Sequence, residues 1–327
     1  MCLSPTQLQI LSAVRTSLRY DLVQPHRDEM TTPGPEIENS TLVLVLAVSG
    51  GCDSMALFHS LVSLTKICEK KSDDGGVGTG NVCNGRSRRL LHLGIENAQL
   101  EPQSCIVPCE LHVAHFNHEQ RGESSDGDCD FVRDRCIEHE VPFYSYSWSD
   151  EEVPDVDVSD TTRYHRVYDP KEALYDNTIF TQDVARQWRQ RKLKELLSSL
   201  VHASDDLSNT DTRWGAILTA HHRDDADETI MLKLLRGSHL TNLRSMNARS
   251  ERFCLQLGNH TSSIGYFAKP MLKVRKSHVL QYLGINSLGW REDASNSSNK
   301  YKRNMVRNEL MPLLSEIAGG ESALRVR

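Results

Sequence analysis

The chain has 327 residues, of which 25% are charged and 38% hydrophobic, and its formal net charge is −6. This length allows two domains or one large α/β domain with an appendage, and no apolar run approaches the roughly 18 residues that a membrane-spanning helix requires. The nine cysteines form no C-x-x-C pair, which argues against zinc-ribbon, thioredoxin-like and iron–sulfur sites and, with their odd number, favours reduced thiols in an intracellular setting.

The first 40 residues are predicted to form a helix and a linker. Ile10, Leu11, Val14 and Leu18 recur at helical spacing, so a short amphipathic helix is expected there. Residues 22–40 are mostly polar and hold three prolines, which is typical of a linker. No compact apolar core of a secretory signal is present, whereas a transit peptide stays open because basic and hydroxyl residues precede the first acid.

The most informative segment is the sequence S-G-G-C-D-S at residues 49–54. It follows the apolar run 42–48, which predicts a buried strand, and precedes a helical pattern over residues 54–68. A glycine turn between a strand and a helix N-terminus exposes backbone N–H groups and the positive end of the helix dipole, which suits an anion. The alternative is an ordinary Gly-Gly turn. A Walker-type loop is excluded because G-x-x-x-x-G-K-[ST] is absent and no lysine lies near the turn.

Strands and helices then alternate along the chain. Strands are predicted at 90–95, 111–116, 141–148 and 216–220, and helices at 128–138, 183–200 and 224–235. Two polar insertions, near 69–89 and 149–177, interrupt this pattern. The alternation predicts an α/β fold with a doubly wound parallel sheet over residues 41–245, whose ligands bind beyond the carboxyl ends of the strands.

Residues 246–327 are predicted to form a linker and a small C-terminal helical region. Residues 250–327 hold 12 Lys and Arg against 6 Asp and Glu, a net charge of +6. Since the whole chain has a net charge of −6, residues 1–249 have a net charge of −12. This asymmetry permits a basic face on which a phosphate backbone docks, and solvated basic helices would produce the same count.

Two further polar clusters follow predicted strands. The first, H-F-N-H-E-Q-R-G-E at residues 115–123, places two histidines and an arginine where a substrate pocket is expected, although a polar loop with incidental histidines also explains it. The second, T-A-H-H-R-D-D-A-D-E-T at 219–229, packs two histidines with four carboxylates. Such a cluster favours a metal or shared protons, and its alternative is an acidic first turn of a helix.

The ordered combination of these motifs resembles the tRNA(Ile)-lysidine synthetase family of the N-type ATP pyrophosphatases, whose PP-loop is spelled S-G-G-x-D-S. The similarity runs from about residue 42 to 314, broken by the two insertions. Other matching segments are L-L-R-G-S at 234–238, A-R-x-x-R at 185–189, K-P-M-L at 269–272, E-D-x-S-N at 292–296 and R-N-M-V-R-N-E-L-M-P at 303–312. The chain departs from the family at Gln190, where a tyrosine is usual, and many relatives continue into further C-terminal domains, so a short form and a fragment both stay open.

The resemblance implies an adenine nucleotide alpha hydrolase-like fold that uses ATP and Mg²⁺. It implies ligation of free L-lysine to C2 of the wobble cytidine of CAU-anticodon tRNA(Ile) through an adenylated cytidine, with release of AMP and diphosphate. It assigns ATP binding to the loop residues and to one histidine of the first polar cluster, namely Ser49, Gly50, Gly51, Cys52, Asp53, Ser54 and His115. Catalysis is expected from Asp53, Asp225, His222 and His118, with Mg²⁺ held by Asp53 and Asp225. The residues expected to contact tRNA are Arg121, Arg186, Arg189, Arg236, Arg303 and Arg307.

Two rival interpretations stay open. Another PP-loop enzyme, such as a tRNA thiolase, would normally show paired cysteines, and Cys105 and Cys109 have the wrong spacing. A catalytically inactive tRNA-binding relative is disfavoured because Ser49, Asp53 and Ser54 are intact. A homodimer stays possible, and the short apolar runs predict no membrane partner. The resemblance implies bacterial-type translation, hence bacteria or organelles, and the two polar insertions favour a plastid or mitochondrion, with the bacterial cytoplasm as the location if the source is bacterial.

Overall fold

The computed structural model describes residues 5–29, 40–67, 88–93, 105–118, 123–150, 182–203, 213–250, 252–255, 263–292 and 302–319. Most of the two predicted insertions lies outside these described residues, and so does Arg121. Among the helices that the structure describes, none combines the length and the apolar character needed to cross a membrane.

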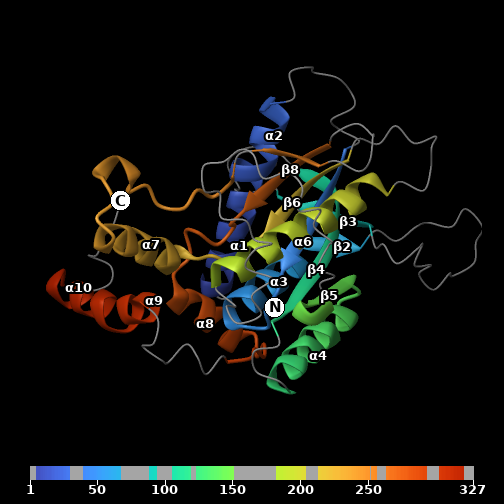
Figure 1. The fold of residues 1–327 in the computed structure, drawn as a ribbon. Helices are drawn as coiled ribbons and strands as arrows, with labels where there is room; N and C mark the ends of the chain where they lie inside the picture. Colours follow the sequence, from blue (N-terminus) through green and yellow to red (C-terminus); the bar gives the residue numbers. More distant parts are fainter. Residues whose placement is uncertain are drawn as a thin grey trace, which may run out of the picture.

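One eight-stranded sheet forms the centre of the molecule (Figure 1). Its strands are β1 (Thr41–Ala47), β2 (Thr65–Ile67), β3 (Arg88–His92), β4 (Ile106–Asn117), β5 (Phe143–Ser147), β6 (Arg213–Leu218), β7 (Phe253–Leu255) and β8 (Ser263–Ala268). The order is β2-β3-β4-β1-β6-β8-β7, and β5 pairs with the second half of β4. The central pairs β4–β1, β1–β6 and β6–β8 are parallel, which confirms the predicted parallel sheet. Both ends of the order are antiparallel, at β2–β3–β4 and at β7–β8.

Helices cover both faces of the sheet because side chains on successive strand residues point to opposite faces. Leu42, Leu44 and Leu46 of β1 are fully buried on the face that carries α3 (Cys52–Leu64), α4 (Glu123–Glu138) and α8 (Lys276–Ile285). Val43 and Val45 are fully buried on the other face, against α6 (Gln182–His202). Burial on both faces explains why β1 is a continuous apolar run rather than an alternating one.

The N-terminal segment is helical for longer than its sequence predicts. The structure contains α1 (Pro5–Ser17), the π-helical segment η1 (Leu18–Val23) and α2 (Gln24–Glu29) in direct succession. The expected amphipathic helix is confirmed, because its four apolar residues are buried in the main core. A linker beginning at Leu22 is wrong, since Leu22 and Val23 are buried in that core at 1% and 2% exposure. Pro25 led to the prediction of a linker, because proline disfavours a helix interior. In the structure it is the second residue of α2, directly after the π-helical segment η1.

The C-terminal part of the chain contributes to the sheet and to a helical group beside it. Strands β7 and β8 belong to the central sheet although they follow residue 245, where the sequence predicts the end of the sheet domain. The helices α7 (Arg223–Leu235), α9 (Lys302–Met305) and α10 (Met311–Ile317), with the π-helical segment η6 (Val306–Leu310), lie together on one side of the sheet (Figure 1). Two short 3₁₀ segments complete the described elements, η3 (Trp148–Asp150) and η4 (Leu240–Asn242).

Candidate active site

The glycine loop lies at the carboxyl end of β1, where the chain turns into α3. Gly50 has a φ of +86°, a left-handed conformation that side chains with a Cβ rarely adopt, so glycine is required there by the backbone. Gly51 is the N-cap of α3 and offers no side chain to cap the helix. A Cβ added at Gly51 would meet, among the described residues, only Ser49 Oγ at 3.5 Å. The loop therefore leaves the start of α3 open to an approaching anion.

The two serines of the loop hold its shape. Ser54 Oγ donates a hydrogen bond to the Gly51 carbonyl at 2.9 Å, and the Ser49 N–H donates to Ser54 Oγ at 3.2 Å. The Gly51 N–H donates to Ser49 Oγ at 3.4 Å. The single O–H of Ser54 is used within the loop, whereas the Ser49 hydroxyl, which accepts from the Gly51 N–H, can turn its own O–H toward a phosphate oxygen.

A lysine from a distant part of the chain completes this loop. Lys276, the first residue of α8, places its ammonium 2.7 Å from each carboxylate oxygen of Asp53 and 2.9 Å from Cys52 Sγ. Burial lowers the pKa of Lys276, but the charge and hydrogen bonds of Asp53 outweigh burial and raise the pKa above its ordinary value. The ammonium is therefore a permanent positive charge at a loop that contains no cation of its own.

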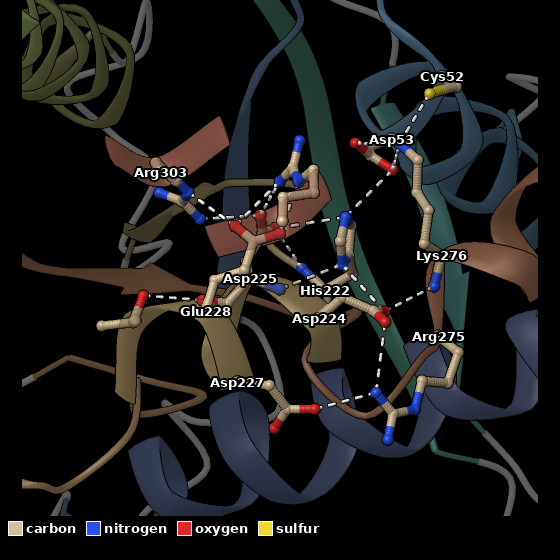
Figure 2. Close-up of polar contacts among 12 residues, drawn as sticks. Cys52, Asp53, His222, Asp224, Asp225, Asp227, Glu228, Arg275, Lys276 and Arg303 are labelled. Atoms are coloured by element: carbon tan, nitrogen blue, oxygen red, sulfur yellow. Dashed lines mark hydrogen bonds and ion pairs between the residues drawn. The ribbon is translucent and has the colours of Figure 1, made fainter. Parts of the chain in front are cut away.

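A cluster of carboxylates surrounds His222 at the carboxyl end of the neighbouring strand β6. Figure 2 shows its ring between Asp53 and Asp224, with Asp225 beside it. His222 Nε2 lies 3.6 Å from Asp53 Oδ1 and 3.5 Å from Asp225 Oδ2, and Nδ1 lies 3.4 Å from Asp224 Oδ2. The ring thus joins the glycine loop on β1 to the acidic start of α7 on β6.

Local structure explains why His222 is at this point. It is the N-cap of α7, and its backbone N–H donates to Asp225 Oδ2 at 3.0 Å while its side chain accepts from the Asp225 N–H at 3.4 Å. This reciprocal capping box satisfies two donors at the helix start and fixes the His222 and Asp225 side chains. The positive end of the helix dipole also stabilises the acids Asp224 and Asp225 of this first turn. The alternative interpretation of the motif, an acidic helix N-terminus, therefore also describes α7.

Two arginines from the C-terminal helices neutralise Asp225 and Glu228 of the cluster. Arg303 donates to Asp225 Oδ1 at 2.9 Å and to Glu228 Oε2 at 2.8 Å. Arg307 donates to Asp225 Oδ1 at 3.2 Å and to Glu228 Oε1 at 2.6 Å. The Glu228 side chain is only 2% exposed, so these pairs supply the charge compensation that a buried carboxylate requires.

Arg275, the N-cap residue of α8, holds the other acids of the α7 N-terminus. Arg275 Nη1 donates to Asp224 at 3.3 Å and to Asp227 at 2.9 Å. The Lys276 backbone N–H donates to Asp224 Oδ2 at 2.8 Å. These bonds tie the start of α8 to the start of α7 and thereby place Lys276 beside the glycine loop.

The pKa values of the neighbouring residues His221 and His222 move in opposite directions. Burial opposes the charged form of His222, but its hydrogen bond to the Asp224 carboxylate and the charges of Asp225 and Asp53 raise its pKa above 6.5. Burial and the nearby cations Lys269 and Arg303 lower the pKa of His221 to about 4, against the opposing effect of Asp225. Burial also opposes ionisation of Asp225, yet the charges of His222 and Arg303 keep its pKa below the ordinary value. At neutral pH the cluster contains a neutral His221 and an ionised Asp225.

The remaining predicted residues lie around this cluster. His115 is 3% exposed and contacts the Val48 carbonyl at 2.9 Å through Nδ1, so it supports the strand that leads into the loop. His118 contacts Arg189 of α6 at 3.4 Å and packs edge-on against Trp188. Arg186 is exposed on the same helix, whereas Arg236 is exposed at the far end of α7.

The structure brings together Asp53, His222, Asp225, Arg303 and Arg307 of the predicted set. Lys276 and Arg275 were not predicted, because nothing in the sequence near either residue indicates its partners. Asp53 lies 223 residues before Lys276, and Asp224 and Asp227 lie 51 and 48 residues before Arg275. Asp224 and Glu228 belong to a recognised motif, but the motif alone did not distinguish them from its other acids.

The donor set fits a magnesium ion at Asp53 better than at Asp225. Within the described residues, no group of three or more His, Cys, Asp or Glu side chains is arranged to hold a metal. Mg²⁺ is usually bound by one or two carboxylates together with substrate phosphates, and Asp53, whose side chain is 31% exposed at the glycine loop, meets that requirement. Two arginines compete with a metal for the oxygens of Asp225, whose side chain is 13% exposed, whereas one lysine, Lys276, competes for those of Asp53.

Comparison with known proteins identifies the family. A family model described as a PP-loop domain matches residues 87–314, and the glycine loop itself precedes the matched range. The chain is 25% identical over 291 residues to a tRNA(Ile)-lysidine synthase of Chlorobaculum tepidum, covering 89% of this chain and 60% of that protein. It is 28% identical over 275 residues to a protein of the same name from Treponema denticola, covering 84% and 42%. The chain thus spans between two fifths and three fifths of the length of these relatives.

The solved structures support the fold. The U34-tRNA thiolase NcsA of Methanococcus maripaludis aligns with a TM-score of 0.51 over 97% of this chain and 75% of that chain. The sequence identity is 14%, so this similarity shows a shared fold. From the family model, which covers well over half of its residues, the chain belongs to the PP-loop domain family, and it is similar along most of its length to tRNA(Ile)-lysidine synthases.

Proposed function

We propose that this chain is an ATP-dependent tRNA-modifying ligase that attaches lysine to C2 of the wobble cytidine of CAU-anticodon tRNA(Ile). The observation that supports this proposal most strongly is the approach of His222 Nε2 to within 3.6 Å of Asp53 in the glycine loop and 3.5 Å of Asp225. A phosphate-binding loop and an acid–histidine cluster therefore share one site. The names of the relatives, which are similar over 84% and more of this chain, supply the substrate class.

In the first half-reaction, the cytidine O2 attacks the α-phosphorus of ATP, and the bond to the bridging oxygen of diphosphate breaks. The glycine loop holds the departing diphosphate through backbone N–H groups and the Ser49 hydroxyl, while Ser54 keeps the loop closed. A magnesium ion, bound by Asp53 and the phosphates, would neutralise negative charge on the leaving group. The His222 ring lies 3.6 Å from Asp53 beside this loop, and its raised pKa favours the form that carries a positive charge.

In the second half-reaction, the ε-amine of lysine attacks C2 and expels AMP, forming the carbon–nitrogen bond of lysidine. The amine must lose protons, and an acceptor is effective only if it is unprotonated at working pH. His221, whose pKa is lowered to about 4, is an unprotonated but weakly basic imidazole beside this cluster. His222 was the histidine expected from the sequence, and its raised pKa suits charge stabilisation rather than proton acceptance.

The proposal extends to partners and location. Arg186 and Arg189 are exposed on α6, where an RNA phosphate can reach them. Arg189 also contacts His118, which follows β4. Free L-lysine, ATP and Mg²⁺ are the remaining substrates and cofactor. A homodimer and a plastid or mitochondrial location, or the bacterial cytoplasm for a bacterial source, belong to the same proposal.

The test is incorporation of radiolabelled lysine into RNA. The protein is incubated with ATP, Mg²⁺, labelled lysine and a CAU-anticodon tRNA(Ile), with a matched tRNA carrying uridine in place of the wobble cytidine as control. Label is expected only in the cytidine-containing tRNA, with one AMP released for each lysine attached. Sulfur incorporation under thiolation conditions, or tRNA binding without AMP release, would instead favour a thiolase or an inactive relative.

A further inference from the structure

The glycine loop, residues 49–54, contains no positively charged side chain although it is expected to bind an anion. The diphosphate part of ATP carries several negative charges, and the loop offers it backbone N–H groups and hydroxyls but no cation. Asp53 adds a negative charge at the same place. A phosphate-binding loop of this composition needs a positive charge from elsewhere in the fold.

Lys276 is the cation that the fold places against the loop. Its ammonium lies 2.7 Å from both Asp53 oxygens and 2.9 Å from Cys52 Sγ, at the first turn of α3 (Figure 2). Its side chain is 33% exposed, so a ligand can reach it. A second basic side chain, Arg291, passes the loop with Cγ 3.6 Å from a Cβ built on Gly50, but its guanidinium is paired with Asp128.

The backbone of Lys276 is held firmly while its ammonium is only tethered. The Lys276 N–H is bound by Asp224, and the preceding residue, Arg275, is paired with Asp224 and Asp227. Only the end of a flexible four-carbon stem remains to move. Lysine acts on phosphate as a mobile point charge, so a small rotation of the stem can transfer the ammonium from one anion to another.

The Lys276–Asp53 pair is not needed to attach α8 to the protein. Val279, Tyr282 and Leu283 of α8 are buried at 3% exposure or less in the main core. A partly exposed ion pair contributes little to stability beside that burial. A structural role therefore does not account for a lysine placed on the loop.

We propose that Lys276 is a phosphate-binding residue, which pairs with Asp53 when the loop is free and with the β- and γ-phosphate oxygens of a nucleoside triphosphate when the loop is loaded. Release of the ammonium leaves the Asp53 oxygens to the cation that accompanies the nucleotide. This inference rests on the proposed use of ATP and adds a binding residue to that site.

Equilibrium binding of three ligands tests it without any need for turnover. ATP, inorganic diphosphate and AMP are titrated calorimetrically into the wild-type protein and into Lys276→Met, Lys276→Arg and Lys273→Met. Lys273 is an exposed lysine three residues away and serves as the matched control. Loss of one charge-assisted contact weakens ATP and diphosphate binding in Lys276→Met by about 10- to 100-fold, with AMP affinity changed less than about twofold. Lys276→Arg is expected to retain most of the ATP affinity, and Lys273→Met all of it.

Equal losses of ATP and AMP affinity in Lys276→Met, or no loss of either, would overturn the proposal. Thermal melting shows whether each variant is folded, and Lys276→Gln, which keeps a polar side chain, is used in place of a Lys276→Met protein that does not fold. The outcome is separable from the function proposed above. If the wild-type protein attaches no lysine to tRNA while Lys276→Met still loses ATP affinity, only the ligase assignment fails; if lysidine forms and ATP affinity is unchanged, only the role of Lys276 fails.

Discussion

The two strand-to-helix junctions of the site share an architecture and differ in charge. At the β1–α3 junction, glycines and serines leave the helix N-terminus open, and Asp53 is the acid of its first turn. At the β6–α7 junction, a histidine N-cap is followed by four acids, Asp224, Asp225, Asp227 and Glu228. The first junction is suited to binding an anion, whereas the second must itself be neutralised before it can be buried.

Both junctions obtain their cations from the same distant part of the chain. Lys276 pairs with Asp53 of the glycine loop, and Arg275 pairs with Asp224 and Asp227. The acids Asp225 and Glu228 pair with Arg303 and Arg307. Part of the positive charge of residues 250–327 therefore neutralises these acids. This region completes the site from within the protein, in addition to any role in docking RNA.

The largest effect is expected at the anion-binding junction. Asp53→Ala should lower AMP formation by about 100-fold or more, because it removes the carboxylate that fits a metal beside the leaving diphosphate. Retention of tRNA on filters should change little. Asp130→Ala, at an exposed acid of α4 paired with Arg133, is the control. Undiminished turnover in Asp53→Ala would remove this residue from the mechanism.

The acidic junction should respond mainly in stability. The double variant Arg303→Met/Arg307→Met leaves Asp225 and Glu228 buried without their cations, so the free energy of unfolding should fall by about 3 kcal/mol in urea denaturation. Lys302→Met, at an exposed neighbouring lysine, should change it by less than about 0.5 kcal/mol. A decrease below about 1 kcal/mol for the double variant would mean that solvent, rather than the arginines, compensates these acids.

The two glycines of the loop allow a finer test of the open junction. Gly50→Ala should lower the free energy of unfolding by about 1 kcal/mol, because Gly50 has a φ of +86° while the added Cβ meets only ordinary contacts at 3.5 Å or more. Gly51→Ala, at a φ of −70°, should leave stability nearly unchanged and weaken ATP binding instead. Equal destabilisation of both variants would contradict a backbone explanation that is specific to Gly50.

The smallest effect is a difference in titration between His221 and His222, measured by NMR of the imidazole resonances. His221 should titrate near pH 4 and His222 above pH 6.5. The stability linked to His221 is present above pH 6.5 and is lost as pH falls toward 4, because the unfolded state then binds more protons. The contribution of His222 is present below pH 6.5 and is lost as pH rises through its raised pKa. Two midpoints near 6.5 would show that neither environment perturbs its histidine.

The sequence was sufficient for the local parts of this molecule. An apolar run, a glycine turn and a helical pattern predicted the β1–α3 junction, and the acidic first turn predicted the start of α7. Both signals are local, since strand burial, left-handed glycine and helix capping depend on residues only a few positions apart. The N-terminal helix was truncated in the prediction because Pro25 and polar neighbours outweighed the two buried residues Leu22 and Val23.

The sequence predicts an α/β sheet with a phosphate-type loop and an acid–histidine cluster on separate strands. The folded chain adds that β1 and β6 are adjacent, so that His222 bridges the two junctions, and that Lys276 reaches Asp53 across 223 residues. The physical reason is that charge compensation acts through space. An ion pair requires only proximity of two groups in the folded chain, and no periodicity or spacing along the sequence records which cation will lie beside which acid.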